Sequence, residues 1–178
     1  MIEELRNKIK SKIIEVPNFP KQGINFKDIN PLLNDSQIGN EIIEFFIEYL
    51  KDKNIQVVAG IESRGFLYAH ALSLKMKLPF VMIRKEGKLP RDVFTEKYTL
   101  EYGEAILEIQ KDAIEKGQNV FLFDDLLATG GTIEAACKLI LSSGAKLGAI
   151  ACLVNLTFLK GNERIHKYSK NFINFVDY

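Results

Sequence analysis

Short apolar runs that alternate with amphipathic helical patterns constrain the fold of this chain more than any other feature. The runs are typical of buried strands and occupy residues 56–61, 79–84, 119–123 and 147–154; the first of them is rich in β-branched residues. A helical pattern follows the first run and another follows the third. We therefore predict an α/β fold with a mainly parallel central sheet flanked by helices. Ligands bind such sheets beyond the carboxyl ends of the strands, so the informative residues should follow the strands.

Two amphipathic helices are predicted ahead of the first strand. One covers residues 2–13, and two prolines soon after it end it. The other covers residues 38–51, and the Asp-Ser pair at 35–36 can cap it. Between them, residues 19–33 mix Gly, Pro and Asp with large apolar residues and have no clear period. We therefore expect an ordered loop there.

One long polar stretch interrupts the pattern of strands and helices. Residues 85–103 have no firm period, which is typical of a lid or of a disordered segment. A short strand is expected at 107–109, and the tail should hold a weak helix and a last strand near 172–176. A chain of 178 residues suits one domain with one sizeable core.

Composition excludes several classes of function. With 24 basic and 23 acidic residues, the net charge of +1 gives no support to a general nucleic-acid or membrane-surface role. Cys137 and Cys152 do not form a CxxC pair, which argues against zinc; both lie in apolar runs and are expected to be buried thiols of a reducing compartment. Neither a signal peptide nor a membrane-length apolar run is expected, so we predict a cytoplasmic protein.

The run VFLFDDLLATGGT at residues 120–132 carries the chemistry. A buried strand delivers Asp124 and Asp125 to the edge of the sheet, and a loop of small residues then enters a helix. Free amides at a helix N-terminus favour an anion such as phosphate. Carboxylates beside a phosphate need another partner, either vicinal hydroxyls, as on a ribose, or a magnesium ion.

Alternatives for this run remain open. A strand that ends in two acids also occurs in nucleotide hydrolases, but these need a GxxxxGK[ST] loop, which the chain lacks. The glycines could form only a tight turn, and Thr129 or Thr132 could simply cap the helix.

The run resembles the ribose-diphosphate motif of the type I phosphoribosyltransferase family, which consists of four apolar residues, two acids and a Thr/Gly loop. The resemblance implies that Asp124 and Asp125 hold the ribose hydroxyls. It also implies that the 5′-phosphate is held by the loop residues Ala128, Thr129, Gly130, Gly131 and Thr132.

Three further segments are similar to the branch of the family that acts on adenine. FPKQGINFKDINPLL resembles its base-recognition segment, GIESRGFLYAHAL its diphosphate loop, and IRKEGKLP with YTLEYGEAILEIQKDAI the two ends of its mobile hood. The resemblance covers about residues 15–160 in collinear order. It implies one phosphoribosyltransferase domain with a base-recognition segment at about 15–35 and a hood at about 86–103.

For the diphosphate, the resemblance implies contacts from Glu62, Ser63, Arg64, Arg84, Lys85 and Lys88, and a cis peptide at Glu62-Ser63. An arginine in a short polar turn after a buried strand can clamp a diphosphate oxygen, which supports Arg64 on physical grounds. Two alternatives stay open: a surface ion pair between Arg64 and Glu62, and a solvated charge run that includes Lys85.

For the base, the resemblance implies that adenine lies between Phe26 and Leu126, and that backbone groups of Asn25 and Lys27 read its amino edge. An aromatic ring in a polar stretch can serve as a stacking platform, although a buried Phe26 is the alternative. The family usually has arginine where Lys27 stands and an apolar residue where Asn25 stands, so the rim of the pocket can differ.

For catalysis, the resemblance implies that Glu101 closes over the base and exchanges a proton at its N7, with Tyr102 beside it as a shield against water. The chemistry needs such a group, because adenine N9 must lose its proton as it attacks the ribose carbon. Water must be kept out, since the ribosyl cation would otherwise be hydrolysed. An exposed strand glutamate is the alternative reading of Glu101.

The resemblance thus implies transfer of phosphoribose from 5-phospho-α-D-ribose 1-diphosphate to adenine, giving AMP and diphosphate in purine salvage. Mg²⁺ is the expected cofactor, bound through the substrate and reached by Asp124 or Asp125 through water. A homodimer is implied, without nucleic-acid or membrane partners. The rivals are an enzyme for xanthine, hypoxanthine-guanine or orotate, and a non-catalytic sensor of the ribose diphosphate. Too few residues precede Pro17 for a helix-turn-helix domain, which disfavours the sensor.

Overall fold

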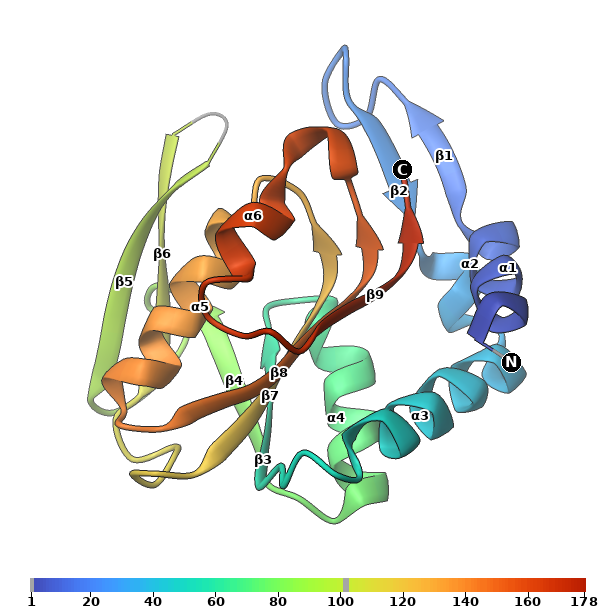
Figure 1. The fold of residues 1–178 in the computed structure, drawn as a ribbon. Coiled ribbons are helices and arrows are strands. Elements are labelled where there is room, and N and C mark those ends of the chain that lie inside the picture. The colour runs from blue at the N-terminus through green and yellow to red at the C-terminus, as the bar shows by residue number, and fades with distance from the viewer. Residues whose placement is uncertain (1, 101–102) are drawn as a thin grey trace. The chain divides into compact units, whose positions relative to one another are not determined.

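The computed structural model describes residues 2–100 and 103–178, which form two compact units at residues 1–46 and 47–178. The first unit holds two helices, two strands and the start of a third helix, drawn from blue to cyan in Figure 1: α1 (Ile2–Lys12), β1 (Ile14–Pro17), β2 (Asn25–Asp28), α2 (Asn30–Leu33) and α3 (Ser36–Leu50). The two predicted helices are confirmed as α1 and α3. Asp35 caps α3, because its Oδ1 accepts a hydrogen bond from the Ile38 amide at 3.1 Å.

The expectation of a loop at residues 19–33 was wrong. This segment contains β2, which pairs with β1 in an antiparallel hairpin, and the single-turn helix α2. Likewise, α1 ends at Lys12 because the chain turns into β1, not because of the later prolines. Strands of four residues are too short for an alternating pattern to stand out in sequence, which explains why both were missed.

The second unit is a seven-stranded sheet with helices on both faces. Its elements are β3 (Val57–Ile61), α4 (Gly65–Met76), β4 (Phe80–Lys85), β5 (Val93–Leu100), β6 (Gly103–Gln110), β7 (Asn119–Leu127), α5 (Gly131–Ser142), β8 (Lys146–Asn155), the 3₁₀ turn η1 (Thr157–Leu159), α6 (Gly161–Ile165) and β9 (Phe172–Asp177). The strand order is β5-β6-β4-β3-β7-β8-β9. The five strands from β4 to β9 in this order are parallel, which confirms the predicted α/β class.

The topology places a ligand site between β3 and β7. The crossover β3-α4-β4 leads toward the β5 edge of the sheet, and the crossover β7-α5-β8 leads toward the β9 edge. Because such crossovers are right-handed, their helices cover opposite faces of the sheet, as Figure 1 shows for α4 and α5. Gly60 pairs with Phe123, so the residues that follow β3 lie beside the end of β7. This is the switch point at which open α/β sheets bind ligands.

The polar stretch at 85–103 is not a structureless lid in the part that the structure describes. β5 pairs with β6 along its whole length, from Val93 with Gln110 to Leu100 with Gly103. The predicted short strand at 107–109 is therefore part of a long antiparallel hairpin. Its strands are mostly half-exposed and polar, so they lack the apolar run by which the buried strands were found.

Both cysteines are free and fully buried, as expected; burial raises the pKa of Cys137 to about 12. Within the residues that the structure describes, no helix is long and apolar enough to cross a membrane.

Candidate active site

The two adjacent acids lie inside the end of β7 rather than after it. Asp124 is 8% exposed and Asp125 is 6% exposed. Asp124 Oδ1 accepts a hydrogen bond from the Asp125 amide at 2.9 Å, and Arg64 Nε lies 2.7 Å from Asp125 Oδ2. That contact has the distance of an ion pair but not the alignment of a hydrogen bond. Asp125 Oδ2 is buried and is contacted by the Arg64 guanidinium as an ion pair, and it accepts no well-aligned hydrogen bond from the described residues.

Burial raises the pKa of both acids. For Asp124, burial and then the charge of Asp125 raise the pKa well above its ordinary value. Burial also raises the pKa of Asp125, although the Arg64 guanidinium opposes this shift. A buried pair of carboxylates is costly to keep charged, and the hydroxyls of a ligand would add hydrogen-bond donors to it. The pair is therefore better suited to hydroxyls than to the oxygens of a phosphate.

The loop after β7 is shaped for an anion. Gly130 is the N-cap residue of α5 and has a positive φ of 85°, a conformation that glycine adopts readily. Because the cap residue has no side chain, the alternative in which Thr129 or Thr132 caps the helix is wrong. The first amides of the 12-residue helix α5 follow this turn, and Thr129 and Thr132 stand on either side of the two glycines in the sequence.

On the neighbouring strand, the turn after β3 contains a cis peptide at Glu62-Ser63, in agreement with the resemblance. The proposed surface ion pair between Glu62 and Arg64 is not formed. Glu62 instead accepts hydrogen bonds from Arg84 Nη2 at 3.0 Å and Nε at 3.2 Å, and from the Lys85 amide at 3.0 Å. The hydrogen bond from Arg84 holds the pKa of Glu62 below its ordinary value.

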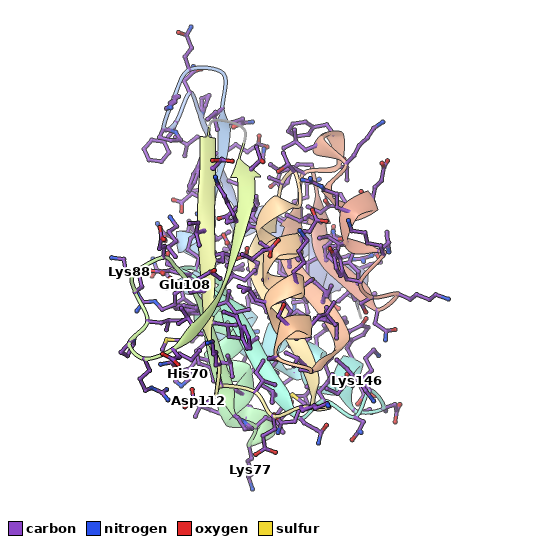
Figure 2. All side chains as sticks on the ribbon, turned by 90° about the vertical axis from the view of Figure 1, so that its left-hand side faces the viewer. His70, Lys77, Lys88, Glu108, Asp112 and Lys146 are labelled. Atoms are coloured by element: carbon purple, nitrogen blue, oxygen red, sulfur yellow. The ribbon has the colours of Figure 1, made fainter. Side chains whose placement is uncertain are left out.

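A tight turn follows β4 and carries the basic cluster; we call residues 85–88 the cationic turn. The Lys88 amide donates to the Lys85 carbonyl at 3.3 Å, and Arg84 Nη1 donates to the Lys88 carbonyl at 3.1 Å. From β6, Glu108 accepts a hydrogen bond from the Gly87 amide at 3.0 Å. Figure 2 labels Lys88 and Glu108, which both lie on the side of the sheet that carries the β5–β6 hairpin.

Sequence reasoning missed Glu108. Its side chain is only 6% exposed, which is unusual for a glutamate and marks it as a structural partner of the cationic turn. A glutamate at an inward-facing position of a strand was the available signal, but β6 had been recognised only in part.

The predicted base-binding residues lie in separate units. Phe26, in β2, is half-buried and makes an edge-on contact with Phe19, with ring centroids 5.2 Å apart. Glu15 accepts hydrogen bonds from Asn25 Nδ2 and Lys27 Nζ, both at 2.6 Å, so both side chains turn toward β1. Leu126 is half-buried in β7 of the second unit. The predicted catalytic residues Glu101 and Tyr102 lie outside the described residues.

Within the second unit, three kinds of group thus meet at the carboxyl ends of β3, β4 and β7: a buried acid pair, an amide-lined loop and a braced cationic turn. Arg64 links the first of these to the turn after β3. Such a set can bind an anion at each end of a polyol, with the hydroxyls on the acids.

Comparison with known proteins agrees with this geometry. Residues 28–177 match the family model of the phosphoribosyl transferase domain. An adenine phosphoribosyltransferase of Ureaplasma parvum serovar 3 is 46% identical over 94% of this chain and 96% of its own length.

Two solved structures are also similar. The adenine phosphoribosyltransferase of Thermoanaerobacter pseudethanolicus is 43% identical, with a TM-score of 0.92 over 97% of this chain and 99% of that one. The enzyme of Saccharomyces cerevisiae, solved with an imino-altritol bisphosphate and adenine, is 34% identical, with a TM-score of 0.91 over 97% and 99% of the two chains. From its sheet, its acid pair and loop, and these similarities, the chain belongs to the phosphoribosyltransferase family.

Proposed function

We propose that this protein transfers phosphoribose from 5-phospho-α-D-ribose 1-diphosphate to adenine, giving AMP and diphosphate for purine salvage. The observation that carries the proposal is the buried acid pair beside the loop that leads into α5, in which Asp125 Oδ2 accepts no well-aligned hydrogen bond from the described residues. A ribose 5-phosphate offers the two hydroxyls and the phosphate that this pairing requires. The adenine phosphoribosyltransferases named above support the choice of base.

In this proposal the protein works mainly by positioning and electrostatics. Asp124 and Asp125 accept the ribose hydroxyls, and the loop at 128–132 holds the 5′-phosphate. Ser63, Arg64, Arg84, Lys85 and Lys88 hold the diphosphate. Glu62 is an acid already engaged by Arg84, so it acts on the diphosphate through that arginine rather than by direct contact.

For the base, Phe26 provides a stacking face and the backbone of Asn25 and Lys27 reads the amino edge. The contacts of both side chains with Glu15 support a backbone role, because the side chains are turned to another partner. Leu126 contacts the base from β7. Glu101 accepts a proton from N7 of adenine as N9 bonds to the ribose carbon and the diphosphate leaves, while Tyr102 excludes water.

The residues present fit a magnesium ion carried by the substrate. Two adjacent carboxylates are too few to hold Mg²⁺ alone, and the described residues contain no cluster of three metal-binding side chains. Mg²⁺ usually binds through one or two carboxylates and substrate phosphates, so Asp124 or Asp125 would reach it through water. When bound, the ion neutralises charge on the leaving diphosphate. We also propose a homodimer and, from the two free buried thiols, a reducing cytoplasmic compartment.

A panel of bases tests the proposal. Adenine, hypoxanthine, guanine, xanthine and orotate are each supplied with the ribose diphosphate, with and without Mg²⁺, and nucleotide formation is measured. We expect turnover of adenine that depends on Mg²⁺. Turnover of another base without adenine would favour a different transferase, and binding of the ribose diphosphate without any turnover would favour a sensor.

The Glu101→Gln variant tests the proton transfer. Removing a general base typically lowers the rate by roughly 10²- to 10⁴-fold. We therefore expect a fall in kcat of that size with the KM for adenine nearly unchanged. Unchanged kinetics would remove Glu101 from the mechanism.

A further inference from the structure

The helix α6 (Gly161–Ile165) packs against the loop at residues 128–132, which we call the phosphate loop. This helix lies beyond residues 15–160, over which the family motifs extend. Figure 1 shows α6 beside the start of α5, where that loop enters the helix. A Cβ on Gly161 would fall well inside contact distance of the Ala128 carbonyl and 2.9 Å from the Gly130 amide nitrogen. The backbones of the loop and of α6 are therefore in direct contact, with room for glycine alone.

Arg164, one turn further along α6, places a cation beside the phosphate loop. Its Nη1 donates a hydrogen bond to the Thr129 carbonyl at 3.4 Å, and a Cβ on Gly131 would lie 3.7 Å from the same nitrogen. The guanidinium thus reaches both the middle of the phosphate loop and the first residue of α5. The side chain is 49% exposed, so a ligand in the loop can approach it.

Glu134, on the first turns of α5, holds Arg164 in this place. Its carboxylate lies 3.3 Å from Arg164 Nε and 2.5 Å from Lys167 Nζ, and it accepts a hydrogen bond from the Tyr168 hydroxyl at 3.2 Å. Burial pushes the pKa of Glu134 upward, but the hydrogen bond and charge of Lys167 and the charge of Arg164 outweigh it and lower the pKa overall. The carboxylate therefore stays charged at neutral pH and anchors both cations.

Charge explains why such a residue is needed. The loop sequence LLATGGT at 126–132 carries no basic side chain, while two acids precede it directly. A phosphate dianion held only by amides and hydroxyls would lie close to those acids without a cation of its own.

We propose that Arg164 is a positioning residue for the 5′-phosphate. It orients the loop through the Thr129 carbonyl and supplies positive charge beside the phosphate. The inference rests on the proposed function, because that function places the phosphate in this loop.

Calorimetric titration separates the two ends of the substrate. Ribose 5-phosphate and AMP probe the phosphate loop, and inorganic diphosphate probes the cationic turn. Arg164→Met removes the charge and the donors but keeps an apolar stem, whereas Arg164→Lys restores the charge alone. Lys167→Met is the matched control, because Lys167 also pairs with Glu134 but has no contact with the loop among those described here. Thermal melting of each variant checks folding.

We expect Arg164→Met to weaken ribose 5-phosphate and AMP about tenfold, a typical loss for a charge-assisted contact. Diphosphate affinity should stay within about twofold, Arg164→Lys should recover part of the loss, and Lys167→Met should bind like the wild type. Unchanged affinity for ribose 5-phosphate in Arg164→Met would overturn the inference. Equal losses for diphosphate, or the same loss in Lys167→Met, would also overturn it, since either would indicate a general structural effect.

Failure of the proposed function looks different in this experiment. A wild-type protein that binds ribose 5-phosphate but does not convert adenine would overturn the choice of base, and Arg164 would still be tested on the sugar phosphate. A wild-type protein that binds no ribose 5-phosphate would overturn the phosphate site and the role of Arg164 together.

Discussion

We assign the loop at residues 128–132 to the 5′-phosphate and the cationic turn at 85–88 to the diphosphate. Both would bind phosphate oxygens, but they are built differently. The loop is part of one continuous run from β7 into α5, and its shape depends on the fit of Gly130 and Gly161. The turn is held by side chains from two other segments, Glu62 after β3 and Glu108 in β6.

This difference has physical consequences. A loop that binds through backbone amides depends on steric fit, so it should be sensitive to added volume and less sensitive to salt. A turn that binds through cations braced by carboxylates depends on charge, so salt and pH should act on it more strongly. Variants that add volume at the phosphate loop and variants that remove charge at the cationic turn test this difference.

Among the variants that compare the phosphate loop with the cationic turn, the largest effect is expected from Gly161→Ala. The added methyl group would overlap the Ala128 carbonyl, and because that atom is backbone, the phosphate loop has to shift. Binding of ribose 5-phosphate should weaken roughly 30- to 100-fold, or about 2–3 kcal/mol, while diphosphate binding changes little. Calorimetry with the two ligands measures both.

Gly39→Ala is the control for this variant. Gly39 lies inside α3, and a Cβ there meets nothing within 4 Å. That change should leave binding unaltered and stabilise the helix by about 0.5–1 kcal/mol. Normal ribose 5-phosphate affinity in Gly161→Ala would mean that the loop tolerates the shift and that steric fit does not define it.

Glu62→Gln should give the next largest effect, on the opposite ligand. The carboxylate takes two donors from Arg84, and an amide at the same place would turn hydrogens toward that guanidinium. We expect diphosphate affinity to fall about tenfold and ribose 5-phosphate affinity to be retained. In the wild type, the lowered pKa of Glu62 means that its stabilising charge is present above its ordinary pKa and is lost as the pH falls through the lower folded value. An unchanged diphosphate affinity of Glu62→Gln at neutral pH would show that Glu62 does not support diphosphate binding.

Glu108→Ala should have a smaller effect of the same kind. It leaves the Gly87 amide without its acceptor, so the cationic turn loosens, but Glu62 and Arg84 still hold its two ends. We expect the KM for the ribose diphosphate to rise about three- to fivefold with kcat retained. Glu104→Ala, an exposed acid on the same strand that pairs with Lys97, is the control and should change neither value. A fall in kcat without a change in KM would argue against a role in binding.

The difference between a site formed by one continuous run and a site formed by distant segments explains what could be predicted from sequence. The phosphate loop and acid pair were predicted because one run of residues carries the strand, the acids, the glycines and the helix. Arg84 and Lys88 were found as a cluster, but Glu108 and Arg164 were not, since each acts through a contact between segments far apart in the chain. The buried parallel strands were predicted from apolar runs, whereas β1, β2 and β5 are short or half-exposed and have no such signal.

The smallest expected effect is a change in stability, from a variant of the acid pair Asp124 and Asp125. Asp124 is buried beside Asp125, and its raised pKa means that its charge destabilises the folded state. Asp124→Asn keeps an acceptor for the Asp125 amide and removes that charge. We expect the variant to be more stable at pH 8 by about 1 kcal/mol, or about 2–4 °C in Tm, although it binds ribose 5-phosphate less well.

The sign of the pH dependence makes this prediction specific. For an acid whose pKa is raised in the folded state, the charge destabilises the protein most above that pKa. The destabilisation disappears as the pH falls to the ordinary pKa of about 4. The stability gained by Asp124→Asn should therefore disappear between pH 8 and pH 4 in urea unfolding. Asp112→Asn, at an exposed acid that pairs with Arg91, should show no such gain. A variant that is less stable than the wild type at pH 8 would mean that the Asp124 charge is compensated in the folded protein, and that the acid pair does not need a ligand hydroxyl to offset its burial.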